Sequence, residues 1–449
     1  MSRPTLTMPG TLGAAFALFM AAPFAAMAQS ATSQNASTTI PPAVSAAQPA
    51  SWYEHPDMAG ALGAERRSLT QKGITFHLDT KMQYGGVISG GKSLGTDYSQ
   101  QVWAGVDVDL GKLVNLQGAL LHFYVSDRAG RSISSDYVGG KYINFGNYGA
   151  EENFRLMNLS YEQKWFGGRV NTLIGNYPLG NEFANTPELC TFTSQTSCAH
   201  TQFFLSASGW LNAPNATWGG RVRFNITPSL YAETGIFESN PLISTHTNYG
   251  WHLGLQGATG SVIPVEFGET VELGPDHLSG TYKIGGYYDN SEVADVAYSK
   301  VKRRGRYGGY IVAKQVIYNI DQSGQRNVQI FGQVNLGDDR TAALPVVFSA
   351  AAIVTGPFAA RPDDLFGVSW TKSNVNSRAL AAEYGILRKA GNQETLYQSE
   401  QLLEVIYTFR LLPWLSFSPD LQYDINPGAF TYKKYDSAWI ASGQLQLHF

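Results

Sequence analysis

The feature that most constrains this fold is an alternation of apolar and polar side chains, which recurs along the chain after Gly73. In the stretch that begins at Ile74, even-numbered positions are mostly apolar and odd-numbered positions are polar. The same pattern returns at 219–227, 250–256, 278–288, 327–336, 403–411, 415–425 and 439–449. Successive side chains of a β-strand point to opposite faces of the sheet. These segments therefore predict strands with one apolar and one polar face.

A soluble sandwich and a transmembrane barrel both produce this alternation, but the chain favours the barrel. The segments run to about 9–12 residues, which is enough to cross a bilayer when tilted. Their apolar faces begin or end in aromatic residues, as an interfacial girdle would. Charged residues make up only 15% of the chain and aromatic residues 12%, yet the mean hydropathy is −0.16 because uncharged polar residues are abundant. We predict an all-β, antiparallel transmembrane β-barrel.

The connections between the segments alternate in length. Short ones, such as 166–168 and 412–414, suit periplasmic turns, and long ones, such as 176–217 and 426–437, suit extracellular loops. About seventeen candidate strands are present, and counts made from the two ends disagree by one strand near 250–290. Since a single-chain bacterial barrel has an even number of strands, we predict sixteen.

The N-terminus predicts export. Residues 1–28 have Arg3, an apolar stretch over 12–24 and the small-residue pattern Ala26-Met27-Ala28, as a signal peptide does. The stretch is short for a membrane anchor. Residues 29–57 are rich in Ala, Ser, Thr and Pro and predict a flexible periplasmic lead. The barrel domain is predicted over 58–449, beginning with a short helix within 58–72.

The two cysteines, Cys190 and Cys198, lie in an irregular segment. In an exported chain we expect them to form a disulfide, the alternative being two free thiols. No metal site is expected, because the cysteines lack a CxxC spacing and the histidines lack HxxxH and HExxH spacings. No cofactor is expected, and the net charge of −3 gives no reason to expect a nucleic-acid partner.

Two short motifs match patterns for other functions. Residues 86–93 fit the P-loop pattern and residues 91–95 fit GxSxG, but no helical pattern follows either one. We expect neither nucleotide binding nor hydrolysis. The basic residues 302–304 and 306 are expected in a solvated connection or against lipid headgroups.

Several segments resemble the OprB family of carbohydrate-selective porins. They are residues 73–76, 153–156 with 161–163, 218–223, 280–289, 356–364, 413–415, 419–423 and 426–428. Their order along one chain carries the resemblance, which covers roughly residues 60–449. It implies a sixteen-stranded outer-membrane barrel that passes sugars by diffusion, without catalysis and often as a monomer.

A sugar-selective pore needs aromatic surfaces for C–H faces and charged or amide groups for hydroxyls. A barrel of sixteen strands also needs inserted loops to be selective. We expect the 176–217 loop to narrow it, followed by the 127–153 segment. Arg221 and Arg223 alternate with apolar neighbours and should face the lumen. The candidate constriction residues are Asp79, Arg155, Glu182, Trp218, Arg221, Arg223, Glu404, Asp420 and Asp424.

Other functions on the same barrel were weighed. A general or non-sugar solute porin fits the alternation equally well, whereas an outer-membrane hydrolase would need a catalytic constellation that the alternation does not assemble. A surface adhesion or scaffold barrel would carry no conductance. Expected partners are sugars, outer-membrane lipid and lipopolysaccharide, and the barrel-assembly machinery, reached through a C-terminal strand ending at Phe449.

Overall fold

The computed structural model describes residues 63–140, 142, 153–196, 198, 207–244, 249–251 and 253–448. The chain divides into Met1–Gln48 and Pro49–Phe449, and every described residue belongs to the second unit. The predicted signal peptide and periplasmic lead therefore lie outside the described residues.

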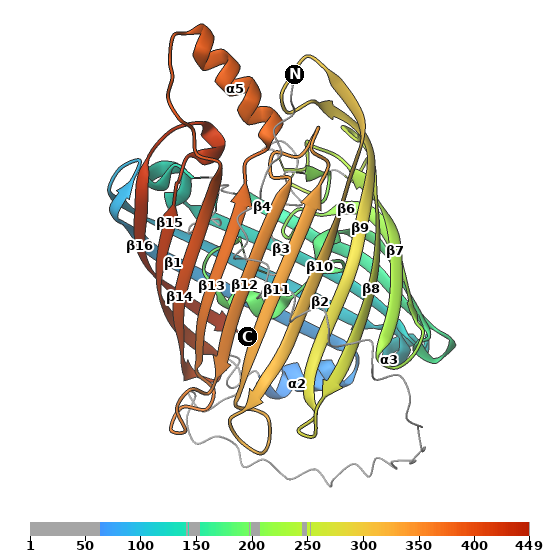
Figure 1. Ribbon diagram of the computed structural model, residues 1–449. Helices are drawn as coiled ribbons and strands as arrows, with labels where there is room; N and C mark the ends of the chain where they lie inside the picture. Colours follow the sequence, from blue (N-terminus) through green and yellow to red (C-terminus); the bar gives the residue numbers. More distant parts are fainter. Residues whose placement is uncertain are drawn as a thin grey trace. The chain divides into compact units, whose positions relative to one another are not determined.

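Sixteen strands form a closed antiparallel barrel, as predicted (Figure 1). Each strand pairs with the next along the chain, and β1 pairs with β16 to close the sheet. Closure leaves no exposed sheet edge, which a hydrocarbon environment requires. The strands are β1 Ile74–Gly91, β2 Gly95–Asp109, β3 Ala119–Gly130, β4 Asn153–Trp165, β5 Val170–Tyr177, β6 Thr217–Asn225, β7 Leu230–Ser239, β8 Gly260–Leu273, β9 Leu278–Ala294, β10 Lys302–Asn319, β11 Asn327–Gly337, β12 Val346–Thr355, β13 Leu365–Asn374, β14 Ser399–Leu412, β15 Leu415–Ile425 and β16 Asp436–His448.

The two faces of each strand have the environments that the alternation predicts. On β14, Leu403 and Val405 are 40% and 43% exposed on the outer surface, whereas Glu404 and Ile406 are buried on the inner wall. The outer surface is apolar and the inner wall is mostly polar, as expected of a barrel in lipid.

Helices are few. They are α2 Gly63–Gln71, α3 Leu110–Val114 and α5 Ser377–Lys389, with short helical turns at η3 Ser134–Val138, η5 Phe166–Gly168, η6 Leu179–Asn181, η7 Pro187–Thr191 and η8 Ala429–Thr431. Helix α2 falls within the segment predicted to be helical. None of the helices in the described residues is both long and apolar enough to cross a membrane.

Helix α5, in the β13–β14 loop, was not predicted. Asn376 caps it, because its side chain accepts hydrogen bonds from the backbone N–H groups of Arg378 (2.9 Å) and Ala379 (3.3 Å). Its buried residue Leu380 packs with Val375 and Leu396. The capping residue Asn376 is the signal in the sequence that indicates this helix.

Two expectations about the connections were wrong. The candidate strand 250–256 is not a strand, since β7 ends at Ser239 and β8 begins at Gly260. Removing it resolves the disagreement in strand count. The basic residues 302–306 lie in β10 and not in a connection; their neighbours Ala294 and Asp289 on β9 pair with Lys302 and Arg306.

Candidate functional site

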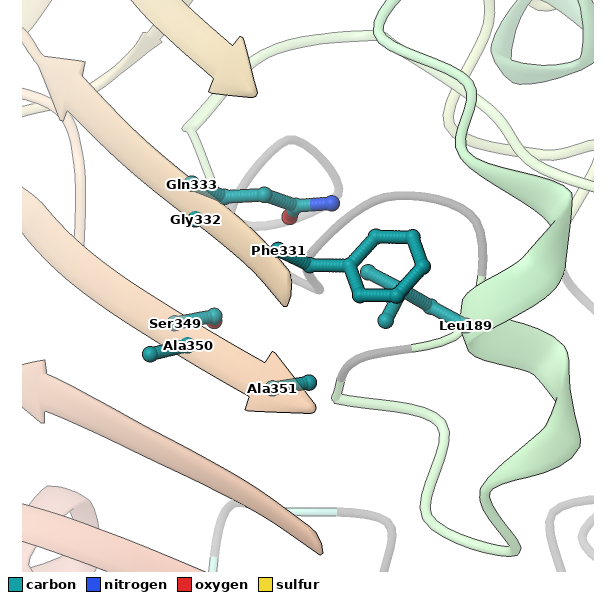
Figure 2. A pocket seen from close by; sticks show the side chains of 7 residues that line it. All are labelled: Leu189, Phe331, Gly332, Gln333, Ser349, Ala350 and Ala351. Atoms are coloured by element: carbon teal, nitrogen blue, oxygen red, sulfur yellow. The ribbon is translucent and has the colours of Figure 1, made fainter. Parts of the chain in front are cut away.

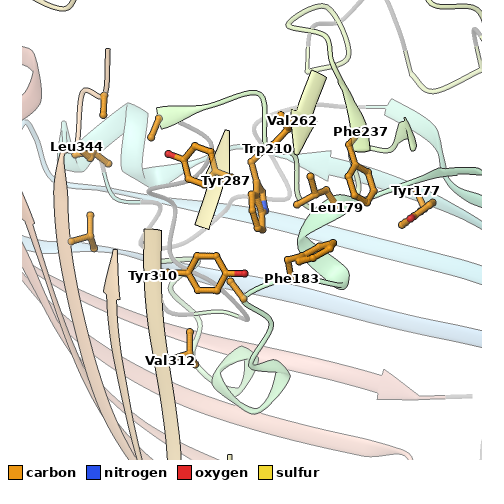
Figure 3. Close-up of a cluster of buried hydrophobic side chains, with 14 of the residues drawn as sticks. Tyr177, Leu179, Phe183, Trp210, Phe237, Val262, Tyr287, Tyr310, Val312 and Leu344 are labelled. Carbon is orange, nitrogen blue, oxygen red and sulfur yellow. The ribbon is translucent and has the colours of Figure 1, made fainter. Parts of the chain in front are cut away.

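The described part of the β5–β6 loop, residues 178–196, 198 and 207–216, folds into the barrel and packs against its inner wall. Figure 3 shows Phe183 and Trp210 of this loop among aromatic side chains of the strands. The Trp210 ring lies 5.9 Å from Tyr287 of β9 and 6.2 Å from Tyr310 of β10, measured between centroids, in edge-on arrangements. Such edge-on aromatic contacts are favourable beyond the area that they bury. The predicted narrowing loop thus shares an apolar core with the inner wall of the barrel.

Buried carboxylates of the inner wall hold the backbone of this loop. Glu266 of β8 accepts from the N–H of Ala184 (2.7 Å). Asp289 of β9 accepts from the N–H of Gly209 (2.6 Å). Both carboxylates are fully buried. These two hydrogen bonds fix two points of the loop on one side of the barrel.

The far end of the loop reaches the wall formed by β11, β12 and β14. Glu404 accepts from the N–H groups of Thr193 (2.6 Å) and Ser194 (3.3 Å). Cys190 and Cys198 form the predicted disulfide beside this contact. Figure 2 shows Leu189 pointing toward Phe331 of β11, with which it shares an apolar cluster. The loop is therefore attached to both sides of the barrel.

The β3–β4 loop also folds inward. Ile133 and Val138 are buried against Val87, Ala438 and Ile440 of β1 and β16. Part of the 127–153 segment thus lies on the inner wall, as expected, although residues 141 and 143–152 lie outside the described residues.

An ion-pair cluster joins the β5–β6 loop to β6 and β7. Arg221 donates to Glu182 of the loop (2.6 Å) and to Asn171 of β5 (2.7 Å). Arg223 donates to Glu233 of β7 through Nε (2.8 Å) and NH2 (3.1 Å). The two arginines face inward, as predicted. Arg223 is the more accessible of the two, with 30% of its side chain exposed against 6% for Arg221.

Three further charged residues at this loop, Lys283, Lys314 and Glu188, were not predicted from the sequence. Lys283 of β9 donates to the carbonyl of Asn185 (2.8 Å), and Lys314 of β10 pairs with Glu188. The two lysines are half-buried on the inner wall. Lys283 alternates with the outward-facing Ile284, so the pattern predicts that the Lys283 side chain faces inward. Its partner was not, because a loop about a hundred residues earlier supplies it.

A chain of hydrogen bonds continues from Arg221 around the inner wall. Asn171 donates to Glu162 of β4, and His122 of β3 lies between Glu162 (3.4 Å) and Asp107 of β2 (2.7 Å). His77 of β1 contacts the other oxygen of Asp107 at 3.0 Å. The inner faces of β1 to β6 are thereby linked by one polar network.

Three other predicted carboxylates lie on the inner wall of β1 and β15. Asp79 contacts His448 and accepts from Gln446 (3.3 Å). Asp420 accepts from Gln422 and Ser442, both at 2.8 Å. Asp424 is fully buried. The partners of Asp79 and Asp420 are groups of the barrel itself. All three carboxylates face inward but are almost completely buried, so they are largely hidden from the channel.

Arg155 and Trp218 do not lie where a constriction would need them. Arg155 is fully buried and donates to the carbonyl of Ile243 (2.7 Å), so it holds the β7–β8 loop. A bulge where β3 pairs with β4, at Tyr124 and Val125, interrupts the alternation of β4 near Arg155. Trp218 is on the outward face of β6, three residues from the inward Arg221, and its indole N–H donates to the carbonyl of Leu253 (2.9 Å). The prediction for Trp218 was wrong.

The motifs set aside from the sequence have ordinary structural roles. Residues 86–95 form the end of β1, a tight turn and the start of β2, so no helix follows the glycines. Within the described ranges, no group of three or more His, Cys, Asp or Glu residues is arranged to hold a metal ion.

Comparisons with known proteins agree with this architecture. Residues 94–449 match the model of the carbohydrate-selective porin, OprB family. The chain is 27% identical to Porin B of Pseudomonas aeruginosa over 87% of its length and 91% of that protein. It is 23% identical to the putative porin QuiX of Acinetobacter baylyi, over 87% of this chain and 93% of that protein.

A solved structure of OprB from Pseudomonas putida, determined at high pH, superposes with a TM-score of 0.83 at 25% identity. The alignment covers 89% of this chain and all of that one. The closed barrel, the inward loop and these matches converge on one conclusion: the chain belongs to the OprB family of carbohydrate-selective porins and is a channel of the bacterial outer membrane for carbohydrates.

Proposed function

We propose that the channel passes monosaccharides and small oligosaccharides by passive diffusion, and that the charged groups around the β5–β6 loop select them. The observation that supports this most directly is the attachment of that loop inside the barrel beside Arg221, Arg223 and Glu182. Guanidinium and carboxylate groups in fixed positions can bind sugar hydroxyls. Binding must stay weak for a solute to leave, so affinities in the millimolar range are expected.

The proposed pore residues are the charged groups at the β5–β6 loop, called here the loop site, whose side chains are partly exposed. They are Glu182, Glu188, Arg223, Lys283 and Lys314, with Arg221 behind them. Glu404, Asp420, Asp424 and Asp79 are proposed to shape the pore indirectly, through the loop and the wall. Sugars would meet alternating positive and negative groups, which suits neutral solutes dense in hydroxyls.

Single-channel recording in planar bilayers tests this proposal. The double variant Arg221→Ala/Arg223→Ala should raise the sugar concentration for half-maximal block roughly 10-fold, because a hydrogen bond to a charged group contributes about 1.5–3 kcal/mol. Arg169→Ala, at an exposed arginine in the β4–β5 turn, is the control. Unaltered conductance and unaltered sugar block in the double variant would remove both arginines from the pore wall.

Liposome swelling separates sugar selectivity from a general solute pore. Under the proposal, sugars enter vesicles faster than amino acids of similar mass. Equal rates would favour the general porin.

We propose further that residues 1–28 direct export and that the mature chain works as a monomer in contact with lipid and lipopolysaccharide. The C-terminal strand β16, followed by Phe449, is proposed as the segment that the barrel-assembly machinery binds. Native mass spectrometry of the purified protein would measure both the mature N-terminus and the number of subunits.

A further inference from the structure

The inner wall of β1 to β3 carries an aromatic surface that the loop site does not use. Trp103 of β2 and Tyr124 of β3 both face inward, with ring centroids 5.9 Å apart and planes inclined by 45°. The imidazole of His77 on β1 lies 5.7 Å from the Tyr124 ring. Three neighbouring strands thus contribute rings to one continuous surface.

This surface remains accessible, whereas most inward aromatic side chains do not. Phe237, Tyr287, Tyr310 and Phe331 are each 5% exposed or less, because the β5–β6 loop covers them. Trp103, Tyr124 and His77 are only half-buried. On β7, Tyr231 is half-buried as well, but the Arg223 guanidinium lies 4.4 Å above its ring.

Gly105 allows the Tyr124 ring to lie against the barrel wall. A Cβ atom at Gly105 would lie only 2.1 Å from Cδ1 and 2.4 Å from Cε1 of Tyr124. The ring therefore occupies the space directly over the glycine, in the register pair Gly105–Tyr124. Its hydroxyl donates to Asp107 (2.9 Å), which His77 and His122 hold in place. The ring is fixed in position before any ligand arrives.

Polar side chains border the aromatic surface. Lys81 and Gln101 are a register pair on the same inner wall, two residues along their strands from Asp79 and Trp103. Arg128 donates to the side-chain oxygen Oε1 of Gln101 at 2.6 Å, which fixes the orientation of the Gln101 amide. An aromatic face flanked by a few polar groups is the composition that sugar binding requires.

We propose that Trp103 and Tyr124 form a sugar-binding subsite on the β1–β3 wall, apart from the charged groups of the β5–β6 loop. The C–H face of a pyranose ring stacks on the aromatic surface, and Lys81 and Gln101 bind its hydroxyls. The proposal rests on the proposed function, since it concerns sugars inside the same channel. It adds a second place where a sugar pauses during passage.

The test uses the full-length protein in planar bilayers, with D-glucose and maltose as probes. Trp103→Ala and Tyr124→Ala should each raise the sugar concentration for half-maximal current block about 3- to 10-fold, since an aromatic contact contributes about 0.5–1.5 kcal/mol. Trp103→Phe should restore most of the block. Gly105→Ala should weaken block without deleting any aromatic group, because the added methyl displaces the Tyr124 ring.

A matched control exists on the outer surface. Trp439 and Tyr423 form a similar pair, 4.5 Å apart, but Trp439 is 41% exposed on the lipid-facing side. Trp439→Ala should leave sugar block unchanged. Should Trp103→Ala fail to fold, Trp103→Leu keeps apolar volume while removing the aromatic face, and it should weaken block to the same extent.

The outcomes separate the two proposals. Wild-type block in Trp103→Leu, Tyr124→Ala and Gly105→Ala overturns the subsite while leaving the proposed function intact. Weakened block in these variants, with the arginine double variant also weakened, supports two sites. Absence of any sugar effect on the wild-type current overturns the proposed function, and the subsite with it.

Discussion

Arg221 and Glu182 form an ion pair whose partners come from different parts of the fold. Arg221 lies on β6, and Glu182 lies near the start of the loop that leads into β6, 39 residues before Arg221. Both side chains are at least four-fifths buried. Removing one member of a buried pair leaves the other charge uncompensated, which is more costly than losing both.

Glu182→Gln should therefore shift the ion selectivity of the channel toward anions. The substitution keeps the size of the side chain but leaves the more distant Glu233 (3.8 Å) as the ion-pair partner of Arg221 among the described residues. The reversal potential in a potassium chloride gradient measures the change. Asp276→Asn, in the exposed β8–β9 turn, should not alter it. An unchanged reversal potential for Glu182→Gln would contradict a pore position for this pair.

At the scale of elements, inward carboxylates of the strands hold the β5–β6 loop. The strand alternation by itself predicts only that these carboxylates face a polar lumen. Glu404 was predicted to line the constriction, but it accepts two backbone N–H groups of the loop. The direction of a side chain follows from its strand, whereas its partner depends on where a long loop folds. The direction of a side chain can therefore be predicted from the sequence, but its partner cannot.

Glu404→Ala should release the disulfide end of the loop. Each buried N–H left without an acceptor costs about 1–3 kcal/mol, so the loop should detach from β14 part of the time. We expect higher mean conductance and greater open-channel noise in single-channel records. Glu404→Gln retains an acceptor oxygen and should stay close to wild type. Identical records for Glu404→Ala and wild type would show that other contacts suffice.

The β9–β10 connection and helix α5 are linked through Asp295. Its carboxylate accepts from Arg303 (2.9 Å) and from Arg378 of α5 (3.0 Å). The backbone hydrogen bond from Ala297, together with the two arginines, lowers the pKa of Asp295 below its usual value. The pKa of Asp295 is thus lower in the folded protein than in the unfolded chain. The ion pairs therefore stabilise the loop fully at pH values above the unfolded-state pKa. This stabilisation is lost as the pH falls through the folded-state pKa.

Hydrogen exchange of the α5 amides against pH measures this linkage. In the wild type, protection should decline below about pH 4, near the pKa of an unperturbed Asp. Asp295→Asn should reduce protection at neutral pH and remove this part of the acid dependence. Asp339→Asn, at an exposed neighbour, should behave as wild type. A wild-type acid profile in Asp295→Asn would rule out the ion pairs as its cause.

At the scale of the whole molecule, stability depends on a lipid-facing surface that the alternation determines. Leu421 of β15 is 42% exposed on the outer face, between Val405 of β14 and Ala441 of β16. Leu421→Arg should lower the free energy of unfolding by about 2–4 kcal/mol if the side chain lies near the bilayer midplane. Leu421→Met should cost less than about 1.5 kcal/mol. Denaturant titration in lipid vesicles compares the two, and equal losses would argue that this face does not meet lipid.

The sequence by itself determined the barrel, its sixteen strands, the disulfide and the face on which most strand residues lie, with Trp218 as an exception. It did so because the alternation is a local property: successive residues of a strand face lipid outside and water inside in turn, and each environment favours a different kind of side chain. Only the tertiary structure decided what the inward residues do. Arg221 pairs with a loop, Glu404 anchors one, Arg155 is buried beneath another, and Trp103 and Tyr124 stay accessible. The partners of a long loop depend on how it packs across the barrel, and no local pattern encodes contacts between residues that lie 39 to 211 positions apart.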